Sequence, residues 1–496
     1  MIVEELATQI MQTFGFVPTA DQAKATAVFS RFLLDRDGSS VMIMRGSAGT
    51  GKTSLAAAIV KTLVKLRQRV ILLAPTGRAA KVFSVNAGRP AFTIHRRIYR
   101  QKTFAGESTG FSLNDNMYHD TLFIVDEASM IANGGGGEGA VFGTGCLLDD
   151  MVSFVYGGHN CRMMIIGDMA QLPPVGEEES PALMADFMAG YGLKVYQCDL
   201  NEILRQASGS GILYNATEIR SMITHDEVTR LPKITFSGFA DIRMVPGGEL
   251  IEQLNSSYAE VGTDETIVIT RSNKRANAYN AGIRGMVLGR EEELTTGDML
   301  MVVRNNYYWT EKAAAEEKAL EDSSMGNGDG RKAESQALPF IANGDRAMVV
   351  RVRNLREFYG LHFADVWLQF PDYDNYEIMV TAVTDSLMAE APALTREQSE
   401  RLFNGVMEDY QDVPLKADRL KKVRQDPCYN ALQIKYAYAV TCHKAQGGQW
   451  AHIYVDQGYM TDDMLSPDYI HWLYTAFTRA TEKLFLVNWP KTQTEG

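Results

Sequence analysis

A phosphate-binding loop is the feature that most limits the fold of this chain. Residues 46–53 read GSAGTGKT, which matches the pattern GxxxxGK(S/T). In such a loop the backbone N–H groups surround a phosphate, the lysine neutralises the outer phosphates, and the last hydroxyl binds Mg²⁺. The apolar run at 41–44 predicts a strand before the loop, and apolar residues at helical spacing over 54–66 predict a helix after it. We therefore expect ATP with Mg²⁺ to be bound by Gly46, Ser47, Ala48, Gly49, Thr50, Gly51, Lys52, Thr53 and Ser54.

Three further apolar runs predict a parallel α/β sheet. Residues 70–73, 122–125 and 163–166 are each apolar throughout, and each run is followed by polar residues. Short runs without alternation are typical of strands that are covered on both faces. Because ligands bind at the carboxyl ends of such strands, the polar residues that follow the runs are candidates for the site.

An acidic pair follows the run at 122–125. Asp126 can hold Mg²⁺ together with Thr53, and Glu127 can orient or deprotonate a water that attacks the γ-phosphate. Together with Lys52, these residues predict hydrolysis of a nucleoside triphosphate.

The distribution of charge indicates a second polyanion. The chain of 496 residues has a net charge of −12, which argues against binding nucleic acid by bulk charge. Residues 45–102 nevertheless contain five lysines, eight arginines and no acidic residue. Only a few of these cations can serve one triphosphate, so nucleic acid is the natural second ligand. A solvated face balanced by acidic residues from elsewhere in the fold is the alternative.

The composition favours a cytoplasmic protein. The five cysteines form no CxxC pair, which is typical of a reducing compartment. No apolar run approaches the roughly 18 residues needed to span a bilayer, so we expect no membrane contact.

The order of the polar blocks resembles superfamily 1 helicases, in the RecD/Dda-like branch that moves 5′ to 3′. The resemblance extends from about residue 17 to 487. It implies that Gln22 binds adenine, that Gln171 reports the γ-phosphate to the DNA side, that Arg205 lies near that phosphate and that Arg479 is the arginine finger. The blocks are residues 19–22 (TADQ), 74–80 (APTGRAA), 93–96 (TIHR), 126–130 (DEASM), 167–175 (GDMAQLPPV), 200–206 (LNEILRQ), 441–449 (TCHKAQGGQ) and 474–480 (YTAFTRA).

The same resemblance implies contacts with single-stranded DNA. One departure is that Gly448 and Gln449 stand where many members carry an acidic residue, which puts a ribose contact there in doubt. The DNA-binding candidates are Pro75, Thr76, Arg78, His95, Arg96, Phe104, Phe111, Thr441, His443 and Lys444.

A hairpin is expected between residues 96 and 119. The stretch is too long for a simple connection, and it holds aromatic residues separated by turn-forming residues. In relatives, a β-hairpin at this place acts as a pin that splits the duplex. We expect Phe104 or Phe111 to lie near its tip and to stack on a base. The alternative is that these rings pack the base of the hairpin.

The expected architecture is two RecA-like P-loop domains with the ATP site between them, a β-hairpin insertion and an inserted SH3-like β-barrel. Two segments, 133–145 and 311–336, are expected to be unstructured because of their Gly-rich and polar composition. The predicted boundaries are 1–199 for the first domain with its hairpin at 96–119, 200–296 and 431–496 for the second, and 297–430 for the barrel.

The predicted function is that of an ATP-dependent DNA helicase that translocates on single-stranded DNA. Its expected partners are single-stranded DNA, junctions of single- and double-stranded DNA, and other DNA repair or recombination proteins. Two alternatives remain open at this point. The chain could be a RecD-type motor subunit of a multi-protein nuclease, or a P-loop ATPase switch that does not act on nucleic acid.

Overall fold

The computed structural model divides the chain into two units. The first unit comprises residues 1–244, 445–455 and 459–496, and the second comprises 245–444 and 456–458. The residues that the structure describes are 2–104, 107–134, 143–202, 209–225, 230–323 and 340–495.

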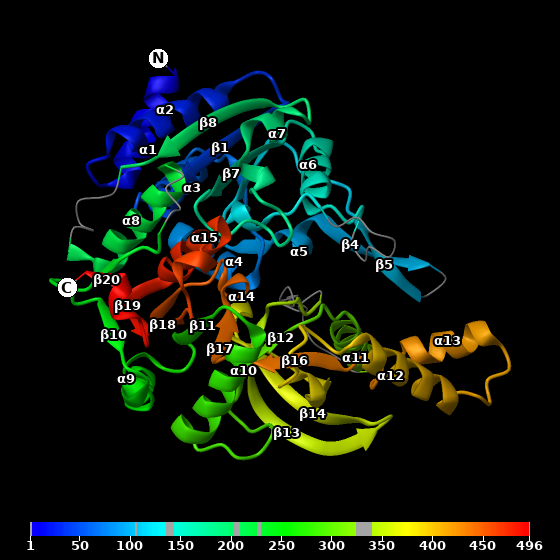
Figure 1. Ribbon diagram of the computed structural model, residues 1–496. Helices are drawn as coiled ribbons and strands as arrows, with labels where there is room; N and C mark the ends of the chain where they lie inside the picture. The colour runs from blue at the N-terminus through cyan, green and yellow to red at the C-terminus, as the bar shows by residue number, and fades with distance from the viewer. Residues whose placement is uncertain are drawn as a thin grey trace. The chain divides into compact units, whose positions relative to one another are not determined.

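The first unit is built on a parallel sheet of six strands with the order β3-β2-β6-β7-β1-β8 (Figure 1). Strand β1 lies between β7 and β8, and all of the neighbouring pairs are parallel. The phosphate loop, the acidic pair and Asp168 follow β1, β6 and β7, so all three lie at the carboxyl edge of the sheet. The strands are β1 Ser40–Gly46, β2 Arg69–Ala74, β3 Ala91–Thr93, β6 Thr121–Val125, β7 Arg162–Gly167 and β8 Lys194–Leu200.

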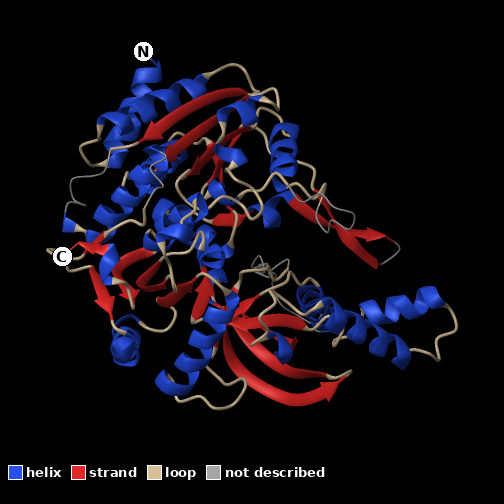
Figure 2. Ribbon diagram, in the orientation of Figure 1, coloured by secondary structure: helices blue, strands red, loops and turns tan. Residues whose placement is uncertain are grey.

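Helices cover both faces of this sheet (Figure 2). One face is packed by apolar side chains of α1 Ile2–Phe14, α2 Ala20–Leu34, α3 Lys52–Lys65 and α4 Gly77–Ala87. On the other face Phe154 of α6 lies with its ring centroid 5.9 Å from that of Phe123 in β6. Burial on both faces explains why these strands are apolar without alternation. The remaining elements of the unit are α5 Ile94–Ile98, α6 Leu147–Gly157, α7 Ala185–Ala189, α8 Gly211–His225, α15 Pro467–Phe477, β9 Ile234–Thr235, β10 Ile242–Val245, β18 Trp450–Asp456, β19 Ala480–Val487 and β20 Thr494–Glu495.

The predicted hairpin is present in the first unit. Strands β4 Tyr99–Phe104 and β5 Glu107–Leu113 pair antiparallel, from Tyr99 opposite Leu113 to Phe104 opposite Glu107. The pair extends away from the sheet as a two-stranded arm (Figure 1).

The second unit contains the predicted barrel, in which five strands close in the order β12-β13-β14-β15-β16. All of the neighbouring pairs are antiparallel except β15 with β16, which is parallel. The last strand lies beyond residue 430, where we placed the end of the insertion. The strands are β12 Met299–Val302, β13 Arg346–Phe358, β14 Leu361–Phe370, β15 Tyr376–Val383 and β16 Leu432–Tyr436.

Outside the barrel, the second unit contains the parallel strand pair β11 and β17. The α/β fold with two RecA-like domains, a hairpin and an inserted barrel is confirmed. The remaining elements are β11 Thr266–Thr270, β17 Ala439–Thr441, α9 Leu250–Val261, α10 Asn273–Gly282, α11 Tyr308–Ser323, α12 Arg396–Asp409, α13 Lys416–Arg424 and, where the two units join, α14 Cys442–Ala445.

One of the two segments expected to be unstructured is partly helical. Helix α11 covers the start of the segment 311–336, because its alanine, glutamate and lysine residues are strong helix formers. The helix is anchored by Trp309, which is buried and donates a hydrogen bond of 2.9 Å to the Asn430 carbonyl. The prediction was therefore wrong for residues 311–323, and residues 324–336 lie outside the described part.

The second segment, 133–145, carries neither helix nor strand at the five positions that are described. Its residues 135–142 lie outside the described part. Among the helices that the structure describes, none combines the length and apolar character needed to cross a membrane.

Candidate nucleotide and nucleic-acid sites

Steric constraints explain the glycines of the phosphate loop. Gly49 and Gly51 have φ angles of 77° and 78°, in the left-handed region that other residues avoid. A Cβ atom on Gly46 would lie 2.9 Å from both the Leu200 Cβ and the Thr50 Oγ1. The loop therefore turns tightly from β1 into α3, and helix α3 begins at Lys52.

Polar groups of the loop are held by partners within the first unit. The Lys52 Nζ donates to the carbonyl oxygens of Gly46 and Ser47 at 2.5 and 2.8 Å. The Ala48 N–H donates to the Tyr474 hydroxyl at 2.9 Å, and Arg220 donates to the Ser47 Oγ. Tyr474 and Arg220 therefore contact the loop, although we singled out neither from the sequence.

The acidic pair lies beside the loop at the end of β6. The Asp126 N–H donates to the Leu73 carbonyl at 3.0 Å, which fixes the turn after the strand. Burial and the neighbouring charge of Glu127 raise the pKa of Asp126, while Lys52 and Arg479 act in the opposite direction. Burial and the neighbouring charge thus raise the free energy of the Asp126 carboxylate, and a bound cation would lower it again.

These residues fit a magnesium ion that is shared with phosphate and water. The part of the chain that is described holds no cluster of three or more His, Cys, Asp or Glu side chains suited to a metal. Mg²⁺ in phosphate sites is commonly held by one or two protein oxygens and by the substrate phosphates. Thr53 and Asp126 would hold the ion, which would neutralise charge on the phosphates.

A buried arginine lies next to the acidic pair. Arg479 is only 2% exposed, and its Nη1 lies 3.6 Å from the Glu127 Oε1. It also donates to the carbonyls of Gly448 and Thr475 at 3.3 and 3.2 Å. Sequence blocks more than 300 residues apart thus meet at one place, as the resemblance implied.

The segment after β7 is fixed by helix α15 and by the 441–449 block. The Leu172 N–H donates to the Thr475 Oγ1 at 2.8 Å, and the Gln446 Nε2 donates to the Leu172 carbonyl at 2.6 Å. The His471 Nδ1 lies 2.9 Å from the Ala170 carbonyl oxygen. Gln171 is buried in this segment, and its Oε1 has no hydrogen-bond partner among the described residues.

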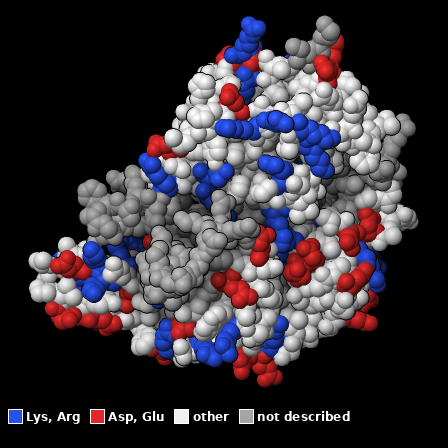
Figure 3. Space-filling model, turned by 180° about the vertical axis from the view of Figure 1, so that it is seen from behind, with Lys and Arg blue, Asp and Glu red and all other residues white. Residues whose placement is uncertain are grey.

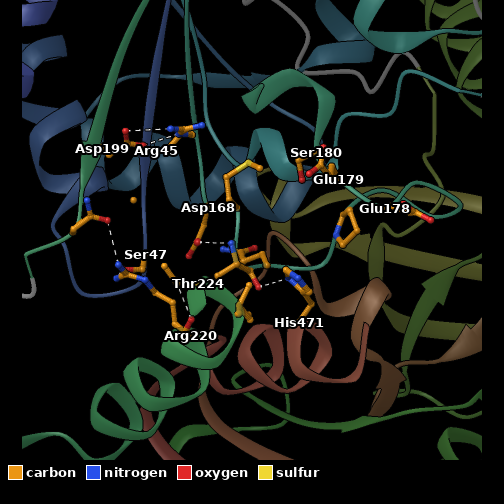
Figure 4. A pocket seen from close by; sticks show the side chains of 17 residues that line it. Arg45, Ser47, Asp168, Glu178, Glu179, Ser180, Asp199, Arg220, Thr224 and His471 are labelled. Carbon is orange, nitrogen blue, oxygen red and sulfur yellow. Dashed lines mark hydrogen bonds and ion pairs between the residues drawn. The ribbon is translucent and has the colours of Figure 1, made fainter. Parts of the chain in front are cut away.

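A cavity of about 410 Å³ opens beside the start of the phosphate loop. Its lining includes Ser47, Asp168, Gln171 and Arg220. Figure 4 shows Arg220 reaching from α8 to Ser47, with Asp168 nearby. The cavity therefore brings together the phosphate loop, the segment after β7 and an arginine on α8.

Gln22, which was predicted to bind adenine, lies against the phosphate loop. Gln22 is fully buried; its Nε2 donates to the Thr50 carbonyl at 2.9 Å, and its Oε1 accepts from the Thr19 N–H at 3.0 Å. It thus lies against the loop as part of the capping box that begins α2. Arg205 lies outside the described residues.

The DNA-binding candidates between residues 74 and 96 lie on helices α4 and α5 or directly before α4. Thr76 caps α4, since its Oγ1 accepts from the Ala79 N–H at 3.2 Å. Arg78 donates to the Gln449 carbonyl at 2.8 Å, and its guanidinium lies 5.6 Å from the Trp450 ring. Pro75 is half-buried directly before this cap.

His95 and Arg96 lie on α5, directly before the hairpin. Burial lowers the pKa of His95 to about 4, so its imidazole is neutral near pH 7 and cannot neutralise a phosphate. The Arg96 guanidinium lies 5.8 Å from the Phe92 ring. Lysine and arginine side chains gather over the upper part of the face shown in Figure 3.

The two phenylalanines of the hairpin occupy different places. Phe104 pairs with Glu107 directly beside the turn, so the register puts position 104 next to the tip. Phe111 pairs with Gln101 further from the turn and is only 9% exposed. The low exposure of Phe111 therefore favours packing at the foot of the hairpin over stacking on a nucleobase.

The remaining DNA-binding candidates belong to the second unit. Thr441 ends β17 and is half-buried, and His443 is exposed on α14. Burial lowers the pKa of Lys444.

Two family descriptions match the chain. An AAA domain matches residues 19–231, and a UvrD-like helicase C-terminal domain matches residues 436–487. The ATP-dependent DNA helicase dda of Enterobacteria phage T4 is 26% identical over 266 residues, which cover 52% of this chain and 55% of that protein. Over these regions the chain is similar to superfamily 1 helicases of the RecD/Dda-like branch.

Two further proteins match the chain over different shares of their length. The ATP-dependent RecD2 DNA helicase of Deinococcus radiodurans is 29% identical over 180 residues, or 36% of this chain and 21% of that protein. The chain thus spans about half or less of the length of these two curated relatives. The Pif1 helicase from Bacteroides with ADP-AlF3 and single-stranded DNA is 16% identical, covering 96% of this chain and 94% of that one, with a TM-score of 0.46.

The placement of Lys52 predicts the effect of its removal. Lys52→Ala should reduce ATP turnover to below a tenth of wild type, because the outer phosphates lose their cation. Among the described residues its side chain donates hydrogen bonds to carbonyls of its own loop alone, so the melting temperature should change little. Steady-state ATPase and thermal melting test this, with Lys61→Ala on the exposed side of the same helix as the control. Turnover above a tenth of wild type would contradict the assignment.

The acidic pair predicts a separation of binding from hydrolysis. Glu127→Gln should still bind ATP, because Asp126 and Thr53 remain to hold the metal, but turnover should be very slow because an amide cannot accept a proton. Equilibrium nucleotide binding and single-turnover hydrolysis measure the two properties. Loss of nucleotide binding in this variant would show that the roles of the two carboxylates are assigned wrongly.

Proposed function

We propose that this chain is an ATP-dependent DNA helicase that translocates 5′ to 3′ on single-stranded DNA. One observation carries the proposal, namely a network of contacts beside the phosphate loop. Hydrogen bonds join the segment 168–172 to Gln446 and α15, and an ion pair joins Glu127 to Arg479, which lies just beyond α15. In this arrangement, a shift of the groups around the γ-phosphate would be transmitted through these bonds to the 441–449 block, which contains predicted DNA contacts.

The proposed chemistry uses residues in stated roles. Lys52 binds the outer phosphates, and Glu127 orients or deprotonates the attacking water. Arg479 stabilises charge on the transferred phosphoryl group, and Arg205 is assigned the same role by resemblance. By resemblance Gln171 reports the γ-phosphate to the DNA side, and its Nε2 would donate to a phosphate oxygen. Its Oε1 is buried without a partner among the described residues and can only accept, for example from a water.

The proposed substrate is a junction of single- and double-stranded DNA. The dda and RecD2 relatives are DNA helicases by name, and one solved Pif1 complex contains single-stranded DNA. The hairpin supplies a rigid obstacle beside the α5 candidates, so motion along one strand would separate the other. The proposed polarity rests on the resemblance to the RecD/Dda-like branch.

Tailed duplexes test the proposal directly. A duplex with a 5′ single-stranded tail should be unwound in the presence of ATP and Mg²⁺, and the same duplex with a 3′ tail should not. Unwinding of the 3′-tailed duplex alone would reverse the polarity. Absence of unwinding together with retained DNA-stimulated ATPase would favour the motor-subunit alternative.

Arg96 predicts a specific salt dependence. If Arg96 neutralises one phosphate, Arg96→Ala should reduce the slope of log K against log salt by ~0.7 for single-stranded DNA. Arg31→Ala removes the same charge from an exposed position on α2 and should leave the slope unchanged. Fluorescence anisotropy at several salt concentrations measures the slopes of both variants. Equal slopes would show that Arg96 neutralises no phosphate and would favour the alternative of a solvated face.

The register of the hairpin predicts that Phe104 affects strand separation alone. Phe104→Ala should leave DNA-stimulated ATPase within about threefold of wild type, a barrier change of ~0.6 kcal/mol, because translocation does not require the pin. Unwinding of the tailed duplex should fall much further. Phe16→Ala, at a position that is 65% exposed outside the hairpin, is the control. Unchanged unwinding in Phe104→Ala would place strand separation elsewhere in the chain.

A further inference from the structure

The Tyr474 hydroxyl bridges two segments of the nucleotide site. It donates to the Asp168 Oδ2 at 2.7 Å and accepts from the Ala48 N–H at 2.9 Å. A tyrosine hydroxyl has one proton to donate and lone pairs to accept, so both bonds can exist together. Tyr474 is 1% exposed on α15, and burial beside Asp168 raises its pKa, so the hydroxyl keeps its proton.

One end of this bridge is Asp168, which fixes the backbone of the segment that carries Gln171. The Asp168 Oδ1 accepts from the Ala170 N–H at 3.0 Å, and the Asp168 carbonyl accepts from the Gln171 N–H at 3.3 Å. Asp168 therefore shapes the turn after β7, and Tyr474 fixes the carboxylate that does so. Helix α15 holds the same turn at a second point, through the Thr475 hydroxyl bond to Leu172.

The other end of the bridge lies in the phosphate loop. Ala48 directly follows Ser47, whose Oγ accepts from Arg220, and Arg220 also donates to the Asn201 Oδ1 at 3.1 Å. An anion that accepts from the Ala48 N–H competes with the Tyr474 hydroxyl for the same proton. Occupation of the loop by phosphate would therefore change the bonding of Tyr474, and with it the support of Asp168.

We propose that Tyr474 is a positioning residue that couples the phosphate loop to the segment 168–172 through its hydroxyl. The inference rests on the proposed function in one respect, namely that the site hydrolyses ATP. On this proposal, the hydroxyl of Tyr474, and not its ring, is needed for turnover. If the ring alone were required for packing, phenylalanine would serve as well as tyrosine.

Tyr474→Phe tests this with a change of one oxygen atom. The kcat for DNA-stimulated ATP hydrolysis should fall about tenfold, which corresponds to about 1.4 kcal/mol, because Gln171 loses its fixed position. The KM for ATP and the equilibrium affinity for a fluorescent ADP analogue should stay within about threefold, because Lys52 and the loop glycines remain. The matched control is Tyr156→Phe, which removes another hydroxyl of the first unit, one that donates to the Ser40 carbonyl at 2.8 Å.

The outcomes separate the inference from the proposed function. A kcat for Tyr474→Phe within twofold of that for Tyr156→Phe would overturn the inference, as would a loss of ADP affinity as large as the loss of kcat. If wild-type hydrolysis is not stimulated by DNA, the proposed function fails, and the same comparison of kcat is made on the basal rate. If Tyr474→Phe does not fold, Asp168→Asn weakens the other end of the bridge, and the same fall in kcat with preserved ADP affinity is expected.

Discussion

The position of the phosphate loop at the carboxyl end of β1 is the constraint on which the rest of the site depends. Strand β1 lies between β7 and β8, so residues that follow these strands necessarily surround the loop. The close approach of Leu200 to Gly46 shows how tightly the end of β8 packs against the first glycine. Any side chain at position 46 would separate the loop from β8 and displace the polar groups that line the adjoining cavity.

Contacts between distant parts of the sequence then complete the site. Helix α15 supplies His471, Tyr474 and Thr475 to the segment after β7, and Arg479 follows directly at the end of that helix. All of these bonds are buried or partly buried, where an unpaired polar group costs about 1–3 kcal/mol. A shift of the segment after β7 therefore requires a compensating change in α15 or in the phosphate loop. Under the proposed function, these bonds would couple hydrolysis to motion.

Local sequence patterns predicted most of this site, but they failed where tertiary contacts decide the outcome. The loop, Asp126 and the apolar strands could be predicted because each has a steric or burial requirement that is legible over a few residues. The resemblance implied that Gln22 binds adenine, but its burial against Thr50 depends on how α2 packs and could not be predicted from a few residues. Arg220 belongs to no pattern, since only the folding of α8 brings it to Ser47. Tyr474 lies in the block 474–480, yet its bond to Asp168, more than 300 residues away, depends on the fold. The segment at 311–323 was misjudged because its polar composition suits an exposed helix as well as a linker.

If nucleic acid and ATP act on one coupled site, the steady-state ATPase rate of the wild-type protein should depend on the concentration of single-stranded DNA. We expect a basal rate that rises and saturates as the DNA binds, with a half-saturating concentration that increases with salt. A rate that is independent of DNA at every salt concentration would show that the two ligands are not coupled and would favour an ATPase that does not act on nucleic acid.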